Sequence, residues 1–294
     1  MSRARGAVRR LVLACAVGLV ATALAVRAVV AGVAGEEAAL ARYDFDAPPA
    51  DRWKLPKELN EISGLAADRA GRVFAHGDER AIVYQLDPAT HRVVKRFTLG
   101  RPAVRGDFEG IALADGRVFL LTSDGVLYAA PEGRDGDAVA FVTYDTGIGR
   151  SCEVEGLAWI ERDRTFLVAC KLPRVAALRG SLTVFAWSLD RRALAPAPTL
   201  RVPLARVASL LGEAAIHPSE LTRDPTTGHL LLLAARAHAV AELTPAGAVV
   251  RVARLRRSLH RQAEGLTVMP DRTLLVADEA NGDRATLTSY RAAR

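Results

Sequence analysis

The sequence predicts an all-β protein, a five-bladed β-propeller that follows an N-terminal transmembrane or signal helix. The main observation is a five-residue pattern that occurs five times, as "EISGL", "DFEGI", "EVEGL", "HPSEL" and "QAEGL", beginning at Glu61, Asp107, Glu153, His217 and Gln262. The fourth positions of the copies are separated by 46, 46, 64 and 45 residues. A unit of about 46 residues that holds four strands has the size of a propeller blade.

Each copy of the pattern begins a predicted β-hairpin. A turn of Gly, Asp, Arg or Pro residues follows it, and then a second apolar run such as "GRVFLLTSDG" or "RTLLVADEAN". Gly and Asp tolerate tight or left-handed backbone, and one or two weaker strands come next, such as "AIVYQLD" and "VVKRFTL". The repeats therefore predict antiparallel blades whose first strands line a central channel.

Two places depart from the regular repeat. The 64-residue interval contains "PAPTLRVPLARVASLLGEAAIHP", which is Pro-rich and then helix-like, so this interval holds either one blade with an insertion or a degenerate sixth blade. The last unit is short of a strand, because only "ATLTSYR" follows "TLLVADE". We expect residues 40–46, "LARYDFD", to supply its outer strand, which would close the ring and remove an exposed edge.

The N-terminal 35 residues have the features of an export segment. Four arginines precede the apolar stretch "LVLACAVGLVATALAV", and after Arg27 the apolar run resumes through Ala34. This is either an uncleaved signal anchor or a signal peptide with "ALA" at 23–25 as its cleavage site. In both cases the propeller lies on the periplasmic side of the inner membrane, or is secreted after cleavage. We divide the chain into this segment (1–35), a linker with the ring-closing strand (36–60) and the propeller (61–294).

The composition fits one exported β-domain and argues against nucleic-acid binding. Half of the 294 residues are apolar and only 5% are aromatic. The formal charge of +7 includes five arginines in the first 35 residues, where there is no acid, so the rest of the chain carries only +2. No basic stripe interleaved with aromatic residues appears, and we therefore expect no nucleic-acid partner.

Export makes one cysteine pair relevant. Cys152 begins the first strand of the third unit and Cys170 ends its second strand, so hairpin pairing brings both to the same rim. An oxidising compartment permits a disulfide there, and the alternative is two small buried thiols slightly out of register.

The repeats place acidic side chains around the predicted axis. The third positions of the five copies form one column, made of Ser63, Glu109, Glu155, Ser219 and Glu264. The first positions lie two residues earlier, on the same strand face if side chains alternate regularly. They form a second column, made of Glu61, Asp107, Glu153, His217 and Gln262. Oxygen-bearing side chains would therefore line nearly the whole channel mouth.

Carboxylates crowded at one mouth repel one another. Two unit charges about 5 Å apart at an effective dielectric near 20 cost roughly 3 kcal/mol. Either protons are taken up, with raised pKa values, or a cation binds. An all-oxygen ligand set suits Ca²⁺, and the candidate ligands are Glu61, Asp107, Glu109, Glu153, Glu155 and Glu264. Alternatively, these side chains bond neighbouring backbone amides and hold adjacent blades together. We favour this structural role for the second column, above all for Gln262 and His217.

From Glu61 to its end, the chain resembles the bacterial SdiA-regulated family. The residues that carry this resemblance are "ISGL", "FEGI", "VEGL" and "QAEGL" in this order, after an N-terminal membrane segment. The resemblance implies a five-bladed, NHL-like, calcium-binding propeller on the far side of the inner membrane, with no established activity. Its channel glutamates fall on Glu109, Glu155 and Glu264, with Ser63 and Ser219 as its two serines. The "HPSEL" copy departs from the pattern, because Glu220 stands where the family usually has Gly.

Two functions are consistent with these residues. The first is a membrane-anchored, calcium-stabilised propeller that acts as a binding or scaffold module for an unknown small polar ligand or protein partner. The second is a metal-dependent hydrolase of an ester, lactone or phosphoester, with His76 or His217 as the candidate base at the channel mouth. We favour the binding module, since the sequence has no Gly-x-Ser-x-Gly, P-loop, His-Glu-x-x-His or Cys-x-x-Cys motif.

A further mixed-charge ring is predicted at the ends of the second strands on the same rim. Its members are Asp78, Glu79, Asp124, Lys171, Arg236, Asp278 and Glu279. A solvated rim is the simpler interpretation of this ring.

Overall fold

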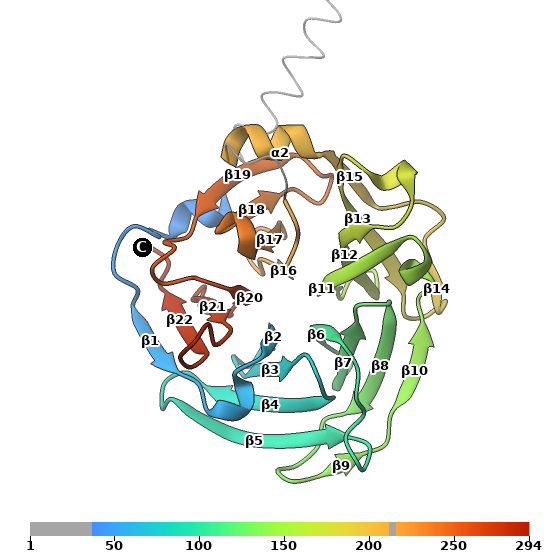
Figure 1. Cartoon of the computed structure of the whole chain (residues 1–294), viewed down its shortest axis with the longest axis vertical. Coiled ribbons are helices and arrows are strands. Elements are labelled where there is room, and N and C mark those ends of the chain that lie inside the picture. The colour runs from blue at the N-terminus through green and yellow to red at the C-terminus, as the bar shows by residue number, and fades with distance from the viewer. Residues whose placement is uncertain (1–36, 212–215, 294) are drawn as a thin grey trace, which may run out of the picture. The chain divides into compact units, whose positions relative to one another are not determined.

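Five β-sheets surround a central axis in the computed structural model, which describes residues 37–211 and 216–293 (Figure 1). Residues 38–294 form one compact unit. The five-bladed prediction is confirmed, and within the described ranges there is no sixth sheet. The predicted signal or anchor segment, residues 1–35, lies outside the described residues. None of the helices that the structure describes is long and apolar enough to cross a lipid bilayer.

Each blade begins at the axis and proceeds outward (Figure 1). The innermost strands are β2 (Ile62–Ala67), β6 (Phe108–Ala114), β11 (Cys152–Ile160), β16 (Glu220–Arg223) and β20 (Ala263–Val268). The second strands are β3 (Val73–Gly77), β7 (Arg117–Thr122), β12 (Thr165–Pro173), β17 (Leu230–Ala234) and β21 (Leu274–Asp278). The third strands are β4 (Ile82–Asp87), β8 (Val126–Pro131), β13 (Ser181–Ser188), β18 (Ala239–Leu243) and β22 (Thr286–Tyr290). We number the blades 1 to 5 in this order.

The outermost strands are less regular. They are β5 (Arg92–Leu99), β10 (Val142–Asp145), β14 (Ala193–Leu194) with β15 (Leu200–Pro203), β19 (Val249–Arg254) and β1 (Asp51–Lys54). A short strand, β9 (Ala138–Val139), adds to β5 in parallel. The helix-like insertion forms α2 (Leu204–Leu211) after β15. Single 3₁₀ turns are η1 (Ala39–Arg42), η2 (Lys57–Leu59), η3 (Ile148–Arg150), η4 (Ala176–Leu178) and η5 (Ala235–Ala237).

The hydrophobic core is divided among the seams between neighbouring blades. Each of five clusters of buried side chains combines residues from two adjacent sheets. Phe74 of blade 1, for example, shares a cluster with Phe108 of blade 2, and both are fully buried. Because no seam is complete without both neighbours, a blade buries its apolar faces only within the closed ring.

The strand that closes the ring lies within the predicted linker region, residues 36–60, but later than the expected residues 40–46. β1 (Asp51–Lys54) pairs antiparallel with β22, with Trp53 opposite Leu287. The expected strand at residues 40–46 is therefore wrong, because η1 occupies its first part. Leu40, Tyr43 and Phe45 enter the seam between blades 4 and 5 instead, where their apolar surface is buried without a strand ladder.

Buried charges hold the segment around η1 against blade 4. The Glu242 carboxylate accepts from the backbone N–H groups of Ala39 (2.6 Å) and Leu40 (2.9 Å), and also contacts His229 Nδ1 (2.6 Å). Arg42 Nη1 pairs with Asp224 Oδ2 at 3.2 Å, and both side chains are buried. A polar group that leaves water needs such partners, so this network fixes where the chain enters the propeller.

The Trp53→Ala variant should test how much the closing strand contributes to stability. Trp53 is 8% exposed in the seam between blades 5 and 1, and its ring stacks on His91 with 5.3 Å between centroids. Truncation of a buried tryptophan leaves a cavity and should lower the free energy of unfolding by about 3 kcal/mol. Urea unfolding measures this, with Val94→Ala as the control because Val94 lies on an outer strand and is 53% exposed. Equal stability of the two variants would contradict the closing role.

The cysteine pair is bridged. Cys152 and Cys170 form a disulfide with their Cα atoms 5.7 Å apart, joining β11 to β12 in blade 3. Of the two alternatives that the sequence left open, the structure has the disulfide.

Removal of this disulfide should destabilise the protein, because the unfolded chain gains conformational freedom without it. The cysteines are separated by 18 residues, and a bridge that closes a loop of about this size restricts the unfolded ensemble by about 3 kcal/mol. We expect the Cys152→Ser/Cys170→Ser double variant to lose about this much stability in urea. Dithiothreitol should lower the stability of the wild type to the same level and leave the double variant unchanged. A reductant effect on the double variant would refute this assignment.

Candidate functional site

β-Bulges in the innermost strands direct the motif side chains. The pairing of β2, β6, β11 and β20 with their neighbours shifts register at the third motif position. The residues at these shifts are Ser63, Glu109, Glu155 and Glu264. A bulge inserts one extra residue and changes the direction of its side chain. The regular alternation on which the second acidic column was predicted is therefore interrupted.

Glycine at the fourth motif position allows the innermost strands to approach closely. Gly156 has φ +87°, and a Cβ placed on it would lie 2.4 Å from the backbone nitrogen of Leu221 in blade 4. A Cβ on Gly110 would lie 2.9 Å from the Leu157 Cβ in blade 3. Only glycine fits such contacts, and this close packing brings the preceding bulge residues together around the axis.

Three of the predicted residues and one lysine form the centre of the site. Lys171 Nζ, at the end of β12, lies 2.5 Å from Glu155 Oε2 and 3.9 Å from Glu109 Oε1. Ser63 Oγ donates to Glu109 Oε2 at 3.1 Å. Burial lowers the pKa of Lys171, but the Glu155 and Glu109 charges more than offset this and raise it above its ordinary value. The ammonium group is therefore the internal counter-ion of these carboxylates.

Glu264 completes this group from blade 5. Its Oε2 atom is buried and has no hydrogen-bond partner in the described part of the chain. Burial and the charges of Glu155 and Glu279 raise the pKa of Glu264 to about 10. Burial and Glu155 likewise raise the pKa of Glu109 to about 8. One lysine therefore balances only part of the charge that these carboxyl groups would carry if all were ionised.

A second acidic group lies nearby on blades 1 and 5. Gln262 Nε2 donates to Glu279 Oε2 in a short contact. Burial, together with the charges of Glu61 and Asp78, raises the pKa of Glu279 to about 7. Burial and Glu61 also raise the pKa of Asp78. The mouth is therefore acidic beyond the three central glutamates, which favours the approach of cations.

The remaining predicted residues lie around this centre. Glu61 and Asp107 are exposed and Glu153 is half-buried. Asp107 and Glu153 act on the centre through their charges, since they raise the pKa values of Glu109 and Glu155. Ser219 is directed elsewhere: its Oγ donates to the Ala263 carbonyl of blade 5 at 3.0 Å and so joins two blades.

The two candidate histidines differ in their surroundings. His76 is fully buried, contacts the Gly77 carbonyl through Nδ1 at 3.0 Å, and has a pKa lowered to about 4 by burial. It is therefore neutral at pH 7. His217 is half-buried at the mouth, with Nδ1 3.3 Å from the Lys171 carbonyl.

The role of Lys171 was not predicted from the sequence, which placed this residue only in the mixed-charge ring at the rim. The sequence feature that could have indicated its role is its position near the end of a second strand, on the same rim as the motif residues.

Glu220 connects three of the innermost strands. It stands at the glycine position of the fourth repeat and is 1% exposed. Its carboxyl oxygens accept from the backbone N–H groups of Leu65 in blade 1 (3.3 Å), Leu157 in blade 3 (3.3 Å) and Leu221 (2.9 Å). One side chain thus satisfies inner-edge amides of three strands, which belong to blades 1, 3 and 4.

The pH dependence of stability should show whether the Glu220 carboxyl group holds a proton in the folded protein. Burial raises its pKa well above the ordinary value of 4.5. The native state then holds a proton that the unfolded chain releases, so stability falls as the pH rises from about 4.5 toward the folded pKa. Other buried acids change the stability with pH in the same direction. The test therefore compares a Glu220 variant with the wild type.

We expect the free energy of unfolding of Glu220→Gln, measured in urea from pH 5 to 9, to fall less steeply with pH than that of the wild type. The exposed Asp163→Asn variant should follow the wild type. If the Glu220→Gln and wild-type slopes coincide, Glu220 does not hold the proton.

The donor set at the mouth suits a hard cation, with one qualification. Glu109, Glu155 and Glu264 offer only oxygen, and Glu264 Oε2 is a buried atom without a hydrogen-bond partner among the described residues. Within residues 37–211 and 216–293, no three Asp, Glu, His or Cys side chains are yet close enough to ligate one ion. The carboxylates meet around Lys171 instead, so a divalent ion would have to displace its ammonium group.

Comparisons with known proteins agree with this architecture. A family model described as SdiA-regulated matches residues 53–282. A crystal structure of the Myxococcus xanthus glutaminyl cyclase superposes with a TM-score of 0.57 at 18% identity, over 83% of this chain and 95% of that one. A luciferin-regenerating enzyme superposes with a TM-score of 0.50 at 10% identity, over 83% and 96% of the two chains. At these identities the structures are alike in fold alone, and no curated protein matches the chain in sequence.

Proposed function

Because this chain belongs to the SdiA-regulated family, we propose that it is an exported, membrane-anchored propeller whose acidic channel mouth binds Ca²⁺. The protein would act as a binding or scaffold module, with a small polar ligand or a protein as its partner. The observation that carries the proposal is the convergence of Glu109 and Glu155 on the single ammonium group of Lys171, with the unpartnered Glu264 Oε2 completing the group from blade 5.

The local charges explain why a divalent ion would bind here. Glu155 is 2% exposed and the side chain of Glu109 is 13% exposed, so the carboxylates are poorly solvated and repel strongly. One ammonium group supplies a single charge and no further coordination. Ca²⁺ would supply two charges and accept six to eight oxygens, including those of Ser63 and water. In this proposal Lys171 and Ca²⁺ compete for the same carboxylates.

Two features support an exported, anchored protein. The arginines and apolar stretch in residues 1–35 have the order of a signal anchor. The Cys152–Cys170 disulfide suits an oxidising compartment such as the periplasm. We therefore place the propeller on the periplasmic side of the inner membrane.

Calcium titration into the EDTA-treated full chain, purified in mild detergent, tests the cation site. We expect saturable heat in calorimetry and a rise in melting temperature. Glu264→Gln and Glu155→Gln should weaken binding by about tenfold or more, because each removes an anionic ligand. Lys171→Gln should strengthen binding, since it removes the competing charge, and Asp163→Asn should match the wild type. A wild type that shows neither heat nor a thermal shift would refute the proposal.

His217 gives the second candidate function a specific basis. It is the predicted histidine that is only half-buried, and it contacts the Lys171 backbone at the acidic mouth. In this alternative the same ion would act as a Lewis acid in hydrolysis of an ester, lactone or phosphoester, with His217 as the base. A substrate panel decides between the two: calcium-dependent turnover that His217→Ala removes supports a hydrolase, and calcium binding without turnover supports the binding module.

A further inference from the structure

The outer edge of blade 4 is covered by α2, one face of which stays in solvent. α2 contacts both β15 and β19, and Val207 is fully buried in the seam between blades 3 and 4. On the other face Leu210 is 58% exposed, more than any other large hydrophobic side chain among the described residues. Arg206 lies four residues earlier, hence on the same face, and is also exposed. α2 therefore presents an apolar and a basic side chain to solvent together.

Two segments of the chain that form this edge contain arginine but no acidic residue. Residues 191–212 include four arginines and residues 243–263 include five, without an Asp or Glu in either segment. The rest of residues 36–294 carries a net charge of −7. The two segments contain β14, β15, α2 and β19, and thus the outermost strands of blades 3 and 4. The exposed arginines here include Arg206 of α2, Arg251 of β19 and Arg257 beyond it. Positive charge is therefore concentrated on the outer edge of these two blades.

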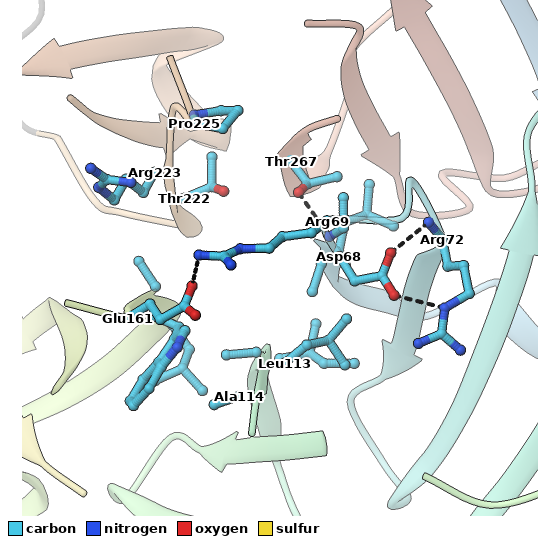
Figure 2. Close-up of a pocket in the computed structure, with 18 of the residues that line it drawn as sticks. Asp68, Arg69, Arg72, Leu113, Ala114, Glu161, Thr222, Arg223, Pro225 and Thr267 are labelled. Carbon is cyan, nitrogen blue, oxygen red and sulfur yellow. Dashed lines mark hydrogen bonds and ion pairs between the residues drawn. The ribbon is translucent and has the colours of Figure 1, made fainter. Parts of the chain in front are cut away.

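Several arginines at the end of the channel opposite the acidic mouth are paired with acids instead. Where the innermost strands turn back, Arg69 of blade 1 extends to Glu161 of blade 3 (Figure 2). At the same end Arg72 lies 2.7 Å from the Asp68 carboxylate. α2 and β19 contain no acid of their own, so an anionic surface can approach their exposed arginines.

The chain enters the propeller at this same edge. η1 contacts β19, and Ala39 is completely buried there, with its backbone nitrogen 2.6 Å from Glu242 Oε1. The apolar stretch of the N-terminal segment ends at Ala34, five residues before Ala39. Five residues of fully extended chain span at most about 18 Å. With the stretch held in the membrane, as proposed above, the outer edge of blade 4 stays close to the lipid headgroups.

We propose that the propeller lies edge-on against the membrane, with the outer edge of blade 4 bound to an anionic lipid surface. This inference rests on the proposed membrane anchor. Leu210 enters the boundary between headgroups and acyl chains, and Arg206 and Arg251 contact lipid phosphates. Lipid is the occupant because one helix face combines an apolar and a cationic side chain beside the anchored end of the chain, and because each arginine near an anionic surface adds attraction.

Edge-on binding leaves the channel accessible. Figure 1, which looks down the axis of the ring, shows α2 and β5 on opposite sides. With α2 at the membrane, the axis runs along the membrane plane and β5 points away from it. Both ends of the channel, including the acidic mouth, therefore stay open to solutes.

Labelled cysteines on the full chain test this orientation in lipid nanodiscs. Leu210→Cys and Val94→Cys, the latter on β5 at a side chain that is 53% exposed, are made in a Cys15→Ser background and labelled with the fluorophore NBD. The native Cys152–Cys170 pair is bridged and does not react. The nanodiscs contain phosphatidylcholine with about one quarter phosphatidylglycerol. We expect lipids with a nitroxide on the acyl chain to quench the label at position 210. That label should be at least about fivefold less accessible to aqueous iodide than the label at position 94.

Arginine variants test the charge on the same labelled protein. Arg206→Gln and Arg251→Gln should each lower the ratio of bound to unbound propeller about fivefold, because one arginine near an anionic membrane contributes about that factor. High salt and nanodiscs of phosphatidylcholine alone should weaken binding in the same way. Arg92→Gln, an exposed arginine on β5, should match the wild type. An equal loss in Arg92→Gln and Arg251→Gln would contradict the proposal.

Alkaline carbonate washing of membranes that contain the protein reports on the anchor separately. Release of the protein would refute the anchored protein and this inference with it. Retention, with position 210 as open to iodide as position 94, would overturn edge-on binding alone. Shielding of position 210 that disappears when the protein is diluted in lipid would show that a second copy covers α2, and would overturn lipid as the occupant.

Discussion

The close approach of five strand edges around one axis is the constraint on which the rest of this structure depends. At Gly156 and Gly110 a single added methyl group would meet the neighbouring strand at 2.4 Å and 2.9 Å. The bulged residue before each of these glycines must therefore extend its side chain along the channel. Carboxylates from separate blades are brought together away from water, and their repulsion requires a counter-charge. Lys171, from the second strand of blade 3, supplies it.

Glu220 connects the inner edges of three blades across the axis. In a ring of glycines the axis would be lined by unpaired inner-edge amides, and one carboxyl side chain at the fourth repeat bonds three of them. Above it, acids outnumber the single lysine. Below it, the acids at the rim are paired with arginine and lysine side chains.

Closure of the ring uses two consecutive segments that bind by different interactions. β1 adds backbone pairing and the Trp53 side chain to blade 5. The segment around η1 contributes buried apolar side chains, backbone amides that bond Glu242, and the buried Arg42–Asp224 ion pair. Buried ion pairs add little net stability but fix geometry, because a misplaced charge would be left without a partner. The chain is thus held at a defined point of the ring where it enters the propeller.

The sequence by itself predicted the propeller and the residues at its axis, because both depend on a repeat that is read directly as spacing, but it left five or six blades open and the structure has five. Five copies of one pattern, with glycine after Glu109, Glu155 and Glu264, were sufficient to predict the ring and its acidic mouth. The helix between the third and fourth repeats was predicted for the same reason, because the repeated pattern is interrupted there. Residues 40–46 were misassigned, since an apolar run predicts burial but does not distinguish a strand from a segment that fills a seam.

Only the tertiary structure decided which charges meet. Lys171 lies outside the repeated pattern and reaches Glu155 because β12 returns to the axis beside β11. The bulges interrupt the regular alternation on which the second column was predicted, and Glu61 and Asp107 are exposed whereas Glu155 is buried. Glu220 looked like a defect of the fourth repeat, whereas the fold gives its carboxyl group three amide donors from separate strands. Contacts between residues tens to more than a hundred positions apart depend on how blades are rotated and bulged, and no local pattern in the chain encodes that geometry.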